Sequence, residues 1–124
     1  SRLIHAAALP DFTEGDWSKF ARCTYRDDGA GRPVLDMDPR IGDAMRDAAG
    51  PLPDLWPLFR LLGKVPTLAI RGATSDILSV ATFDRMQQEK PDLQRLTVPN
   101  RGHAPTLDEP LCRSAIRALL ERSS

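Results

Sequence analysis

The sequence predicts an α/β domain built on two parallel strands, and three features of its second half indicate this. Two short apolar runs, at 65–71 and 93–98, are typical of buried strands. A helical segment from about 80 to 90 lies between them, so we expect parallel strands joined by a right-handed crossover. An amphipathic segment at 111–120 follows and predicts a last helix.

Composition places the chain among globular proteins and excludes several other classes. The 124 residues are 41% hydrophobic and 27% charged, with a formal net charge of zero. Without a block of like charge, we expect neither a nucleic-acid partner nor an anionic membrane. The apolar stretches are far shorter than a membrane span. Cys23 and Cys112 are far apart and predict free thiols in a reducing cytoplasm.

The first half of the chain predicts helices separated by Pro and Gly. Thr13, with Asp16 three residues later, has the pattern of a capping box before a helix with an apolar face. Residues 27–33 predict a turn, which a short extended link follows. Asp38 is expected to cap a second helix, and Asp54 a third.

The helices of the second half have expected caps and inward faces. Ser79 is expected to cap the helix between the strands, with Ala81 and Met86 facing inward. In the last helix the apolar spacing predicts a core face, made of Leu111, Ala115, Ile116, Leu119 and Leu120.

Two titratable side chains follow the two predicted strands. Asp76 lies in the loop after the first strand, and His103 in the loop after the second. Parallel strands bring these loops to one edge of the sheet, so we expect hydrogen-bond reach, about 2.6–3.2 Å, between the two side chains. Such an imidazole can move a proton at neutral pH, and such a carboxylate can hold its tautomer.

The second half also resembles the C-terminal end of the α/β-hydrolase family. The resemblance lies in V-P-T-L-A-I-R-G-A-T-S-D-I-L and in P-D-L-Q-R-L-T-V-P-N-R-G-H-A-P-T-L-D-E-P. It implies that Asp76 is the acid and His103 the base of a catalytic triad that hydrolyses a small ester, lactone or activated C–C bond. It also implies a helical cap or lid portion at 1–53 and the C-terminal part of the hydrolase core at 54–124.

The family's G-x-S-x-G nucleophile motif is missing from this sequence. We therefore interpret the chain as a C-terminal fragment of an α/β-hydrolase fold, with the nucleophile, Ser or Asp, in an N-terminal half. The exposed strand edge is expected to bind that half or a second copy of the chain. The alternative is a non-catalytic remnant or interaction domain. Neither a cofactor nor a metal is implied beyond the small-molecule substrate.

Several other side chains have a structural interpretation. We expect Arg101 to be solvated, and Asp108 and Glu109 to be charges at the start of the last helix. Trp17 and Trp56 are expected in the core because they stand at helical spacing.

Overall fold

The computed structural model describes residues 5–47, 50 and 53–123. Its contacts divide the chain into two units, which we describe separately: unit 1 within 12–54, and unit 2 from 5–11 together with 55–123. Residues 5–11 thus group with the second half, whereas the sequence placed them in the first. The functional assignment of the parts as cap and core stays a prediction. In the described residues, no helix has the length and apolarity that a membrane crossing requires.

Unit 1 begins with helix α2 (Glu14–Thr24), whose capping box is confirmed. The Thr13 hydroxyl accepts from the Asp16 amide at 3.2 Å, and the Asp16 carboxylate accepts from the Thr13 amide at 2.9 Å. Trp17 is buried, as expected, and its ring meets Phe12 edge-on with a centroid distance of 5.1 Å. This aromatic contact anchors the first turn of the helix.

A β-hairpin follows α2 where the sequence predicted only a turn and an extended link. Strands β1 (Tyr25–Asp27) and β2 (Pro33–Leu35) pair antiparallel. The Asp27 carboxylate accepts from the amides of Gly29 at 2.6 Å and Gly31 at 3.1 Å, which closes the loop between them. Three residues per strand leave too little periodicity for a strand pattern to be read.

Helix α3 (Arg40–Asp47) starts where the sequence predicted it. The Asp38 carboxylate accepts from the Arg40 amide at 2.9 Å, as expected of a residue that caps the first turn. The sequence predicted that this helix ends at Gly50–Pro51. Positions 48, 49 and 51 lie outside the described residues, and so does this prediction.

The second segment of unit 2 opens with the short helix α4 (Trp56–Arg60). The prediction that Asp54 caps it was wrong, because the N-cap is Leu55 and no side chain caps the helix. Starting there places Pro57 in the first turn, where its missing N–H costs nothing. The Arg60 guanidinium binds the Glu89 carboxylate with two hydrogen bonds, at 2.6 and 2.8 Å, and so joins α4 to the next helix.

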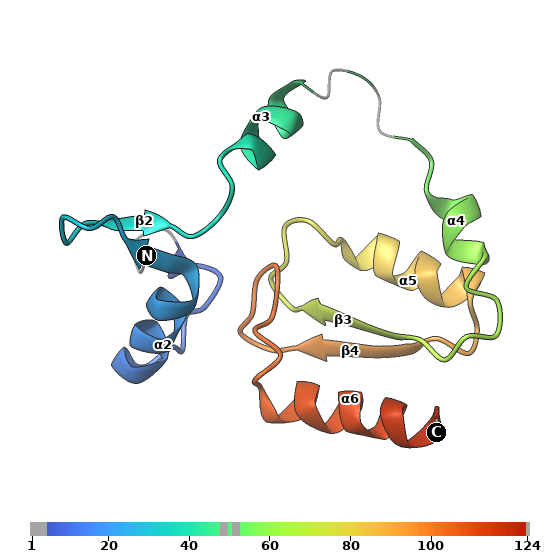
Figure 1. Cartoon of the computed structure of the whole chain (residues 1–124). Helices are drawn as coiled ribbons and strands as arrows, with labels where there is room; N and C mark the ends of the chain where they lie inside the picture. Colours follow the sequence, from blue (N-terminus) through green and yellow to red (C-terminus); the bar gives the residue numbers. More distant parts are fainter. Residues whose placement is uncertain (1–4, 48–49, 51–52, 124) are drawn as a thin grey trace. The chain divides into compact units, whose positions relative to one another are not determined.

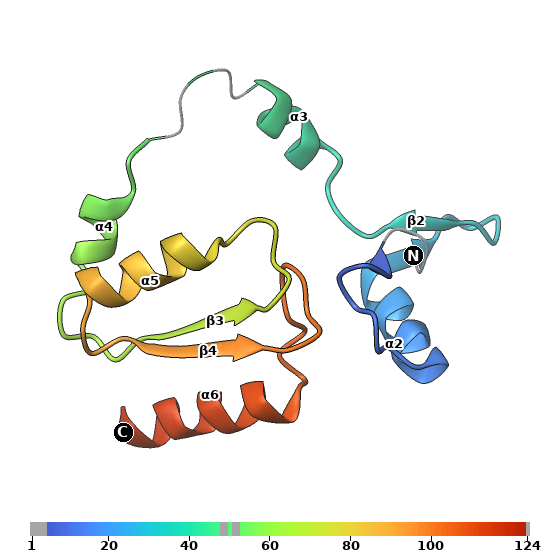
Figure 2. The same cartoon turned by 180° about the vertical axis from the view of Figure 1, so that it is seen from behind.

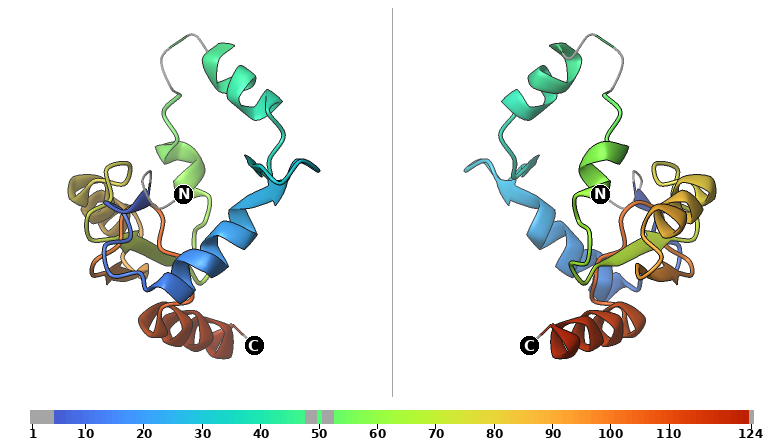
Figure 3. Two further views of the ribbon diagram at one scale, coloured as in Figure 1. Left: turned by 90° about the vertical axis from the view of Figure 1, so that its left-hand side faces the viewer. Right: turned by 90° about the vertical axis from the view of Figure 1, so that its right-hand side faces the viewer.

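The core of unit 2 is a parallel pair of strands, as the sequence predicted. Strand β3 (Leu68–Gly72) pairs with β4 (Gln94–Val98), in a register that aligns the final residues of both strands. Helix α5 (Val80–Glu89) connects them on one side of the pair, and α6 (Pro110–Arg122) lies on the other (Figures 1 and 2). Figure 3, turned by 90° from Figure 1, shows α5 and α6 on different sides of the strands from a second direction.

The buried side chains of unit 2 differ in part from those predicted. In α5, Ser79 accepts from the Thr82 amide at 3.0 Å as expected, but Ala81 is exposed and Phe83 is buried. In α6, the prediction was wrong for Leu111 and Leu120, which are 52% and 62% exposed. The helix instead turns the fully buried Cys112, with the half-buried Ala115, Ile116 and Leu119, toward the strands. Two strands offer a narrow surface, so residues on the flanks of a helix stay in solvent.

Candidate active site at the carboxyl ends of the strands

The loops that follow β3 and β4 are hydrogen-bonded to each other. The Ala73 amide donates to the Val98 carbonyl at 2.8 Å. The Arg101 carbonyl then accepts from both the amide and the hydroxyl of Thr74, at 3.0 and 2.9 Å. The loop that carries Asp76 and the loop that carries His103 therefore start out side by side, as the parallel register predicts.

Arg71 shapes the loop that carries Asp76, which we call the acid loop (residues 73–79). Its side chain is buried at the end of β3 and donates to the carbonyls of Leu78 at 2.6 Å and Ala73 at 3.1 Å. Inside the loop, the Ser75 hydroxyl accepts from the Leu78 amide at 3.1 Å. These bonds fold the loop back on its own strand, so Asp76 sits on a closed turn.

Arg101 and Glu109 shape the loop that carries His103, which we call the base loop (residues 99–109). The Glu109 carboxylate accepts from Arg101 Nε at 2.6 Å, and from the amide and hydroxyl of Thr106 at 3.1 and 3.0 Å. The prediction that Arg101 is solvated was wrong, because its side chain is only 13% exposed. Glu109 precedes α6 but makes no side-chain cap bond to it, so its charge serves the loop.

Residues 5–11 pack on the same base loop. The Gly102 amide donates to the Ala8 carbonyl at 2.7 Å, and the Arg101 guanidinium also pairs with Asp11. A Cβ at Gly102 would lie 2.6 Å from the Ala8 Cβ, which is well inside contact distance. A Cβ at Gly72 would overlap the carbonyl oxygens of Arg101 and Gly102. Both glycines are therefore required by the close approach of backbone segments.

The two predicted site residues lie on these joined loops, and both side chains are exposed. Within the part of the chain that the structure describes, no hydrogen bond or ion pair links Asp76 to His103. The fold brings their loops together but leaves the two side chains unbonded. Their direct pairing stays a prediction.

Two buried titratable groups lie behind the base loop. Burial, the largest influence on Glu109, raises its pKa, but the hydrogen bonds from backbone, Arg101 and Thr106 outweigh it and hold the pKa at about 2. Burial beside Glu109 raises the pKa of the Cys112 thiol to about 11. Cys112 is therefore a protonated thiol at neutral pH and unsuited as a thiolate nucleophile.

The low pKa of Glu109 predicts a loss of stability in acid. Its folded-state pKa of about 2 lies below the ordinary value of 4.5, so its contribution is complete above about pH 5 and is lost toward pH 2. We expect the difference in unfolding free energy between the chain and a Glu109→Gln variant to shrink by up to about 3 kcal/mol over this range. Urea denaturation at several pH values measures it. A difference that does not change with pH would contradict the prediction.

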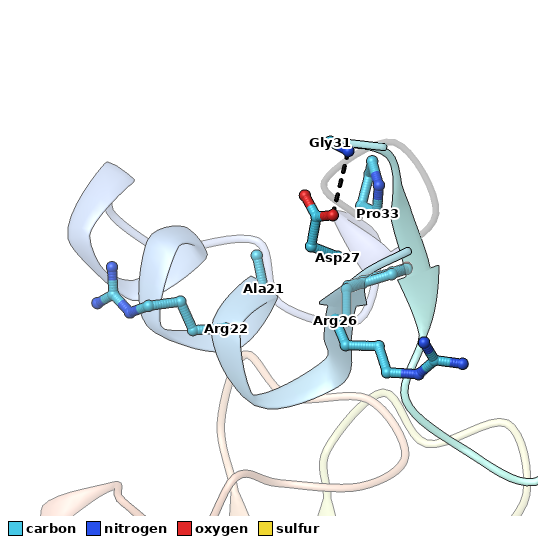
Figure 4. Close-up of a pocket in the computed structure, with 7 residues that line it drawn as sticks. Ala21, Arg22, Arg26, Asp27, Gly31 and Pro33 are labelled. Atoms are coloured by element: carbon cyan, nitrogen blue, oxygen red, sulfur yellow. Dashed lines mark hydrogen bonds between the residues drawn. The ribbon is translucent and has the colours of Figure 1, made fainter. Parts of the chain in front are cut away.

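A pocket of about 350 Å³ lies elsewhere, within unit 1. It is lined by Ala21, Arg22, Tyr25, Arg26, Asp27, Gly31 and Pro33. Figure 4 shows the side chains of Arg22 and Arg26 directed to opposite sides, while Asp27 is bonded to the Gly31 amide. Because the charged groups do not converge, this pocket offers no reacting centre. Across residues 5–47, 50 and 53–123, no three His, Cys, Asp or Glu side chains form a metal-binding group.

Comparison with solved structures identifies the fold. The chain matches an α/β-hydrolase from Novosphingobium aromaticivorans DSM 12444 with a TM-score of 0.85 and 38% sequence identity. The match covers 98% of this chain. The chain has the fold of the C-terminal part of an α/β-hydrolase. It spans only 44% of the length of that solved hydrolase.

A second solved structure supports the same fold at lower similarity. The chain also matches E-2-(acetamidomethylene)succinate hydrolase with a TM-score of 0.62 and 21% identity, over 97% of its own length and 42% of the other chain. At that identity the match supports the fold alone. No protein-family model and no curated protein matches the sequence.

Sequence reasoning missed three residues that organise the candidate site. Arg71 ends a buried strand, which is a signal that its charge must be paired within the fold. Arg101 and Glu109 stand eight residues apart in an irregular loop, where no periodicity links them. Only the closure of the loop brings them into contact.

Proposed function

We propose that this chain supplies the acid, Asp76, and the base, His103, of a catalytic triad that hydrolyses a small ester, lactone or activated C–C bond. The observation that carries the proposal is the hydrogen-bonded pair of loops at the carboxyl ends of β3 and β4. Open parallel sheets bind their ligands at this edge, and these loops present an imidazole and a carboxylate there. The relationship to α/β-hydrolases supports the reaction class.

In the proposed mechanism His103 acts as general base and then as general acid. Its imidazole accepts the proton of the nucleophile's hydroxyl as the oxygen attacks the substrate carbonyl carbon. It returns that proton to the leaving group when the tetrahedral intermediate collapses. Asp76 accepts a hydrogen bond from the other ring nitrogen, which fixes the tautomer and stabilises the imidazolium. In the second step a water molecule attacks the acyl-enzyme, and His103 accepts its proton and returns it to the nucleophile's oxygen as the acid product leaves. An Asp nucleophile bears no proton, so it would use His103 only to activate the water of this second step.

The nucleophile and the oxyanion donors are proposed to come from a preceding N-terminal half of the protein. Among the described residues, β3 and β4 each have only one strand neighbour, so each leaves an edge available for pairing. Apolar side chains on unit 2 are also widely exposed, including Leu61 at 79% and Ile77 at 72%. Both features support a partner segment, either the N-terminal half or a second copy. The free thiols Cys23 and Cys112 fit the cytoplasmic location that we propose.

The test of this function compares the chain alone with the chain joined to its N-terminal half, the segment upstream in the reading frame. We expect no turnover of p-nitrophenyl acetate by the chain alone, because attack and oxyanion stabilisation are both missing. The joined protein should turn it over. If the chain alone turns over the ester and His103→Ala abolishes that turnover, the proposal that the nucleophile lies outside this chain is wrong. A joined protein inactive on esters, lactones and C–C substrates would favour the non-catalytic alternative.

A further inference from the structure

One carboxylate oxygen ties together both ends of the base loop. Glu109 Oε1 accepts from Arg101 Nε, two residues before His103, and from the amide and hydroxyl of Thr106, three residues after it. The chain between Arg101 and Thr106 is therefore closed into a ring, with His103 inside it. Losing this one acceptor would remove a hydrogen bond from both ends of the ring at once.

The ion pair between Arg101 and Glu109 is buried, unlike a surface ion pair. The side chains of Glu109 and Arg101 are only 8% and 13% exposed. Among the described residues Glu109 Oε2 is buried without a hydrogen-bond partner, which costs free energy. Buried ion pairs add little to stability over an apolar pair, and their best-attested use is to fix one arrangement among several. The cost is consistent with a geometric role.

Arg101 also connects the ring to the acid loop. Its carbonyl accepts from the amide and hydroxyl of Thr74, while its guanidinium pairs with Glu109 and Asp11. The residue that Glu109 holds is thus the residue that joins the two loops. A shift of Arg101 would change the separation between His103 and Asp76.

The backbone at the two ends of the ring is held in an uncommon conformation. Asn100 has φ of 54° and Leu107 has φ of 66°, in the left-handed region that side-chain-bearing residues seldom adopt. Such residues persist only where neighbouring interactions determine them. Arg101 and Thr106, the residues that bind Glu109, are the chain neighbours of these two positions.

We propose that Glu109 is a positioning residue for the base: together with Arg101 it fixes the base loop against the acid loop and keeps the His103 imidazole within reach of Asp76. This inference rests on the proposed function, because the ring has a catalytic role only if His103 is the base. Glu109 itself touches no substrate and transfers no proton.

The test uses Glu109→Gln in the full chain, labelled for NMR. Gln keeps the volume but loses the charge that holds Arg101. We expect the amide shifts of 100–107 and the imidazole resonances of His103 to change, while the amides of β3 and β4 stay in place. In the joined protein kcat should fall on the order of 10²-fold with little change in KM. Glu121→Gln, an exposed carboxylate on helix α6, which begins just after Glu109, is the matched control and should change neither.

The outcomes separate the positioning role from the function beneath it. A folded Glu109→Gln chain with unchanged His103 resonances and unchanged 100–107 amides overturns the positioning role. If that variant unfolds, Arg101→Lys decides in its place, because it keeps the charge and loses the forked geometry. Unfolding of both variants overturns the proposal, because the pair would then serve global stability. If Glu109→Gln changes the His103 resonances but the joined protein has no hydrolase activity, the positioning role is supported and only the proposed function is contradicted.

Discussion

Replacing His103 by alanine should abolish hydrolysis by the joined protein, with kcat lower by about 10⁴-fold or more and KM little changed. The imidazole is the only group proposed to move protons in both steps, so its loss leaves the nucleophile unactivated. Steady-state kinetics with p-nitrophenyl acetate measure the effect. Asp76→Asn should cost about 10⁴-fold, because an amide favours the wrong histidine tautomer.

The chain's second histidine provides the control for this experiment. His5→Ala makes the same substitution in the segment that packs on the base loop, and it should change kcat less than about twofold. Equal losses in His5→Ala and His103→Ala would point to a folding defect. Full activity in His103→Ala would remove His103 from the mechanism.

Replacing Gly72 by alanine should destabilise unit 2 by about 3 kcal/mol or more. The added methyl group would overlap the carbonyl oxygens of Arg101 and Gly102. Backbone atoms cannot rotate away as a side chain can, so the acid and base loops must separate. Urea denaturation gives the free energy of unfolding, and loss of turnover in the joined protein should accompany it.

Gly15→Ala adds the same methyl group in an open position. The nearest atom there is Thr13 Oγ1 at 3.7 Å, and Gly15 lies inside helix α2. Alanine favours helix over glycine, so this variant should gain about 0.5–1 kcal/mol. Unchanged stability in Gly72→Ala would show that the close approach of the loops is not required.

The sequence was informative where local rules decide the structure. Caps at Thr13 and Ser79 depend on residues three positions away, and they formed as predicted. The parallel pairing of β3 and β4 follows from one connecting helix between two apolar runs. These features need no knowledge of distant parts of the chain.

Sequence reasoning failed where distant residues decide the structure. Nothing local distinguishes Glu109 from a solvated charge at a helix start, because its partner Arg101 depends on how the loop closes. Leu111 and Leu120 lie at apolar positions of α6, but the narrow strand pair leaves them exposed. Asp54 had the chemistry of a cap, yet the N-cap is Leu55 and the helix begins one residue later, at Trp56.

The division of the chain has a consequence for how the protein can vary. The chain leaves unit 2 at Asp11, which pairs with Arg101, and re-enters it at Leu55, so residues 12–54 are an insertion between two segments of unit 2. The entropy of closing such an insertion grows only with the logarithm of its length, and each doubling costs about 0.6 kcal/mol. Residues 12–54 can therefore be lengthened, shortened or exchanged at small thermodynamic cost to unit 2.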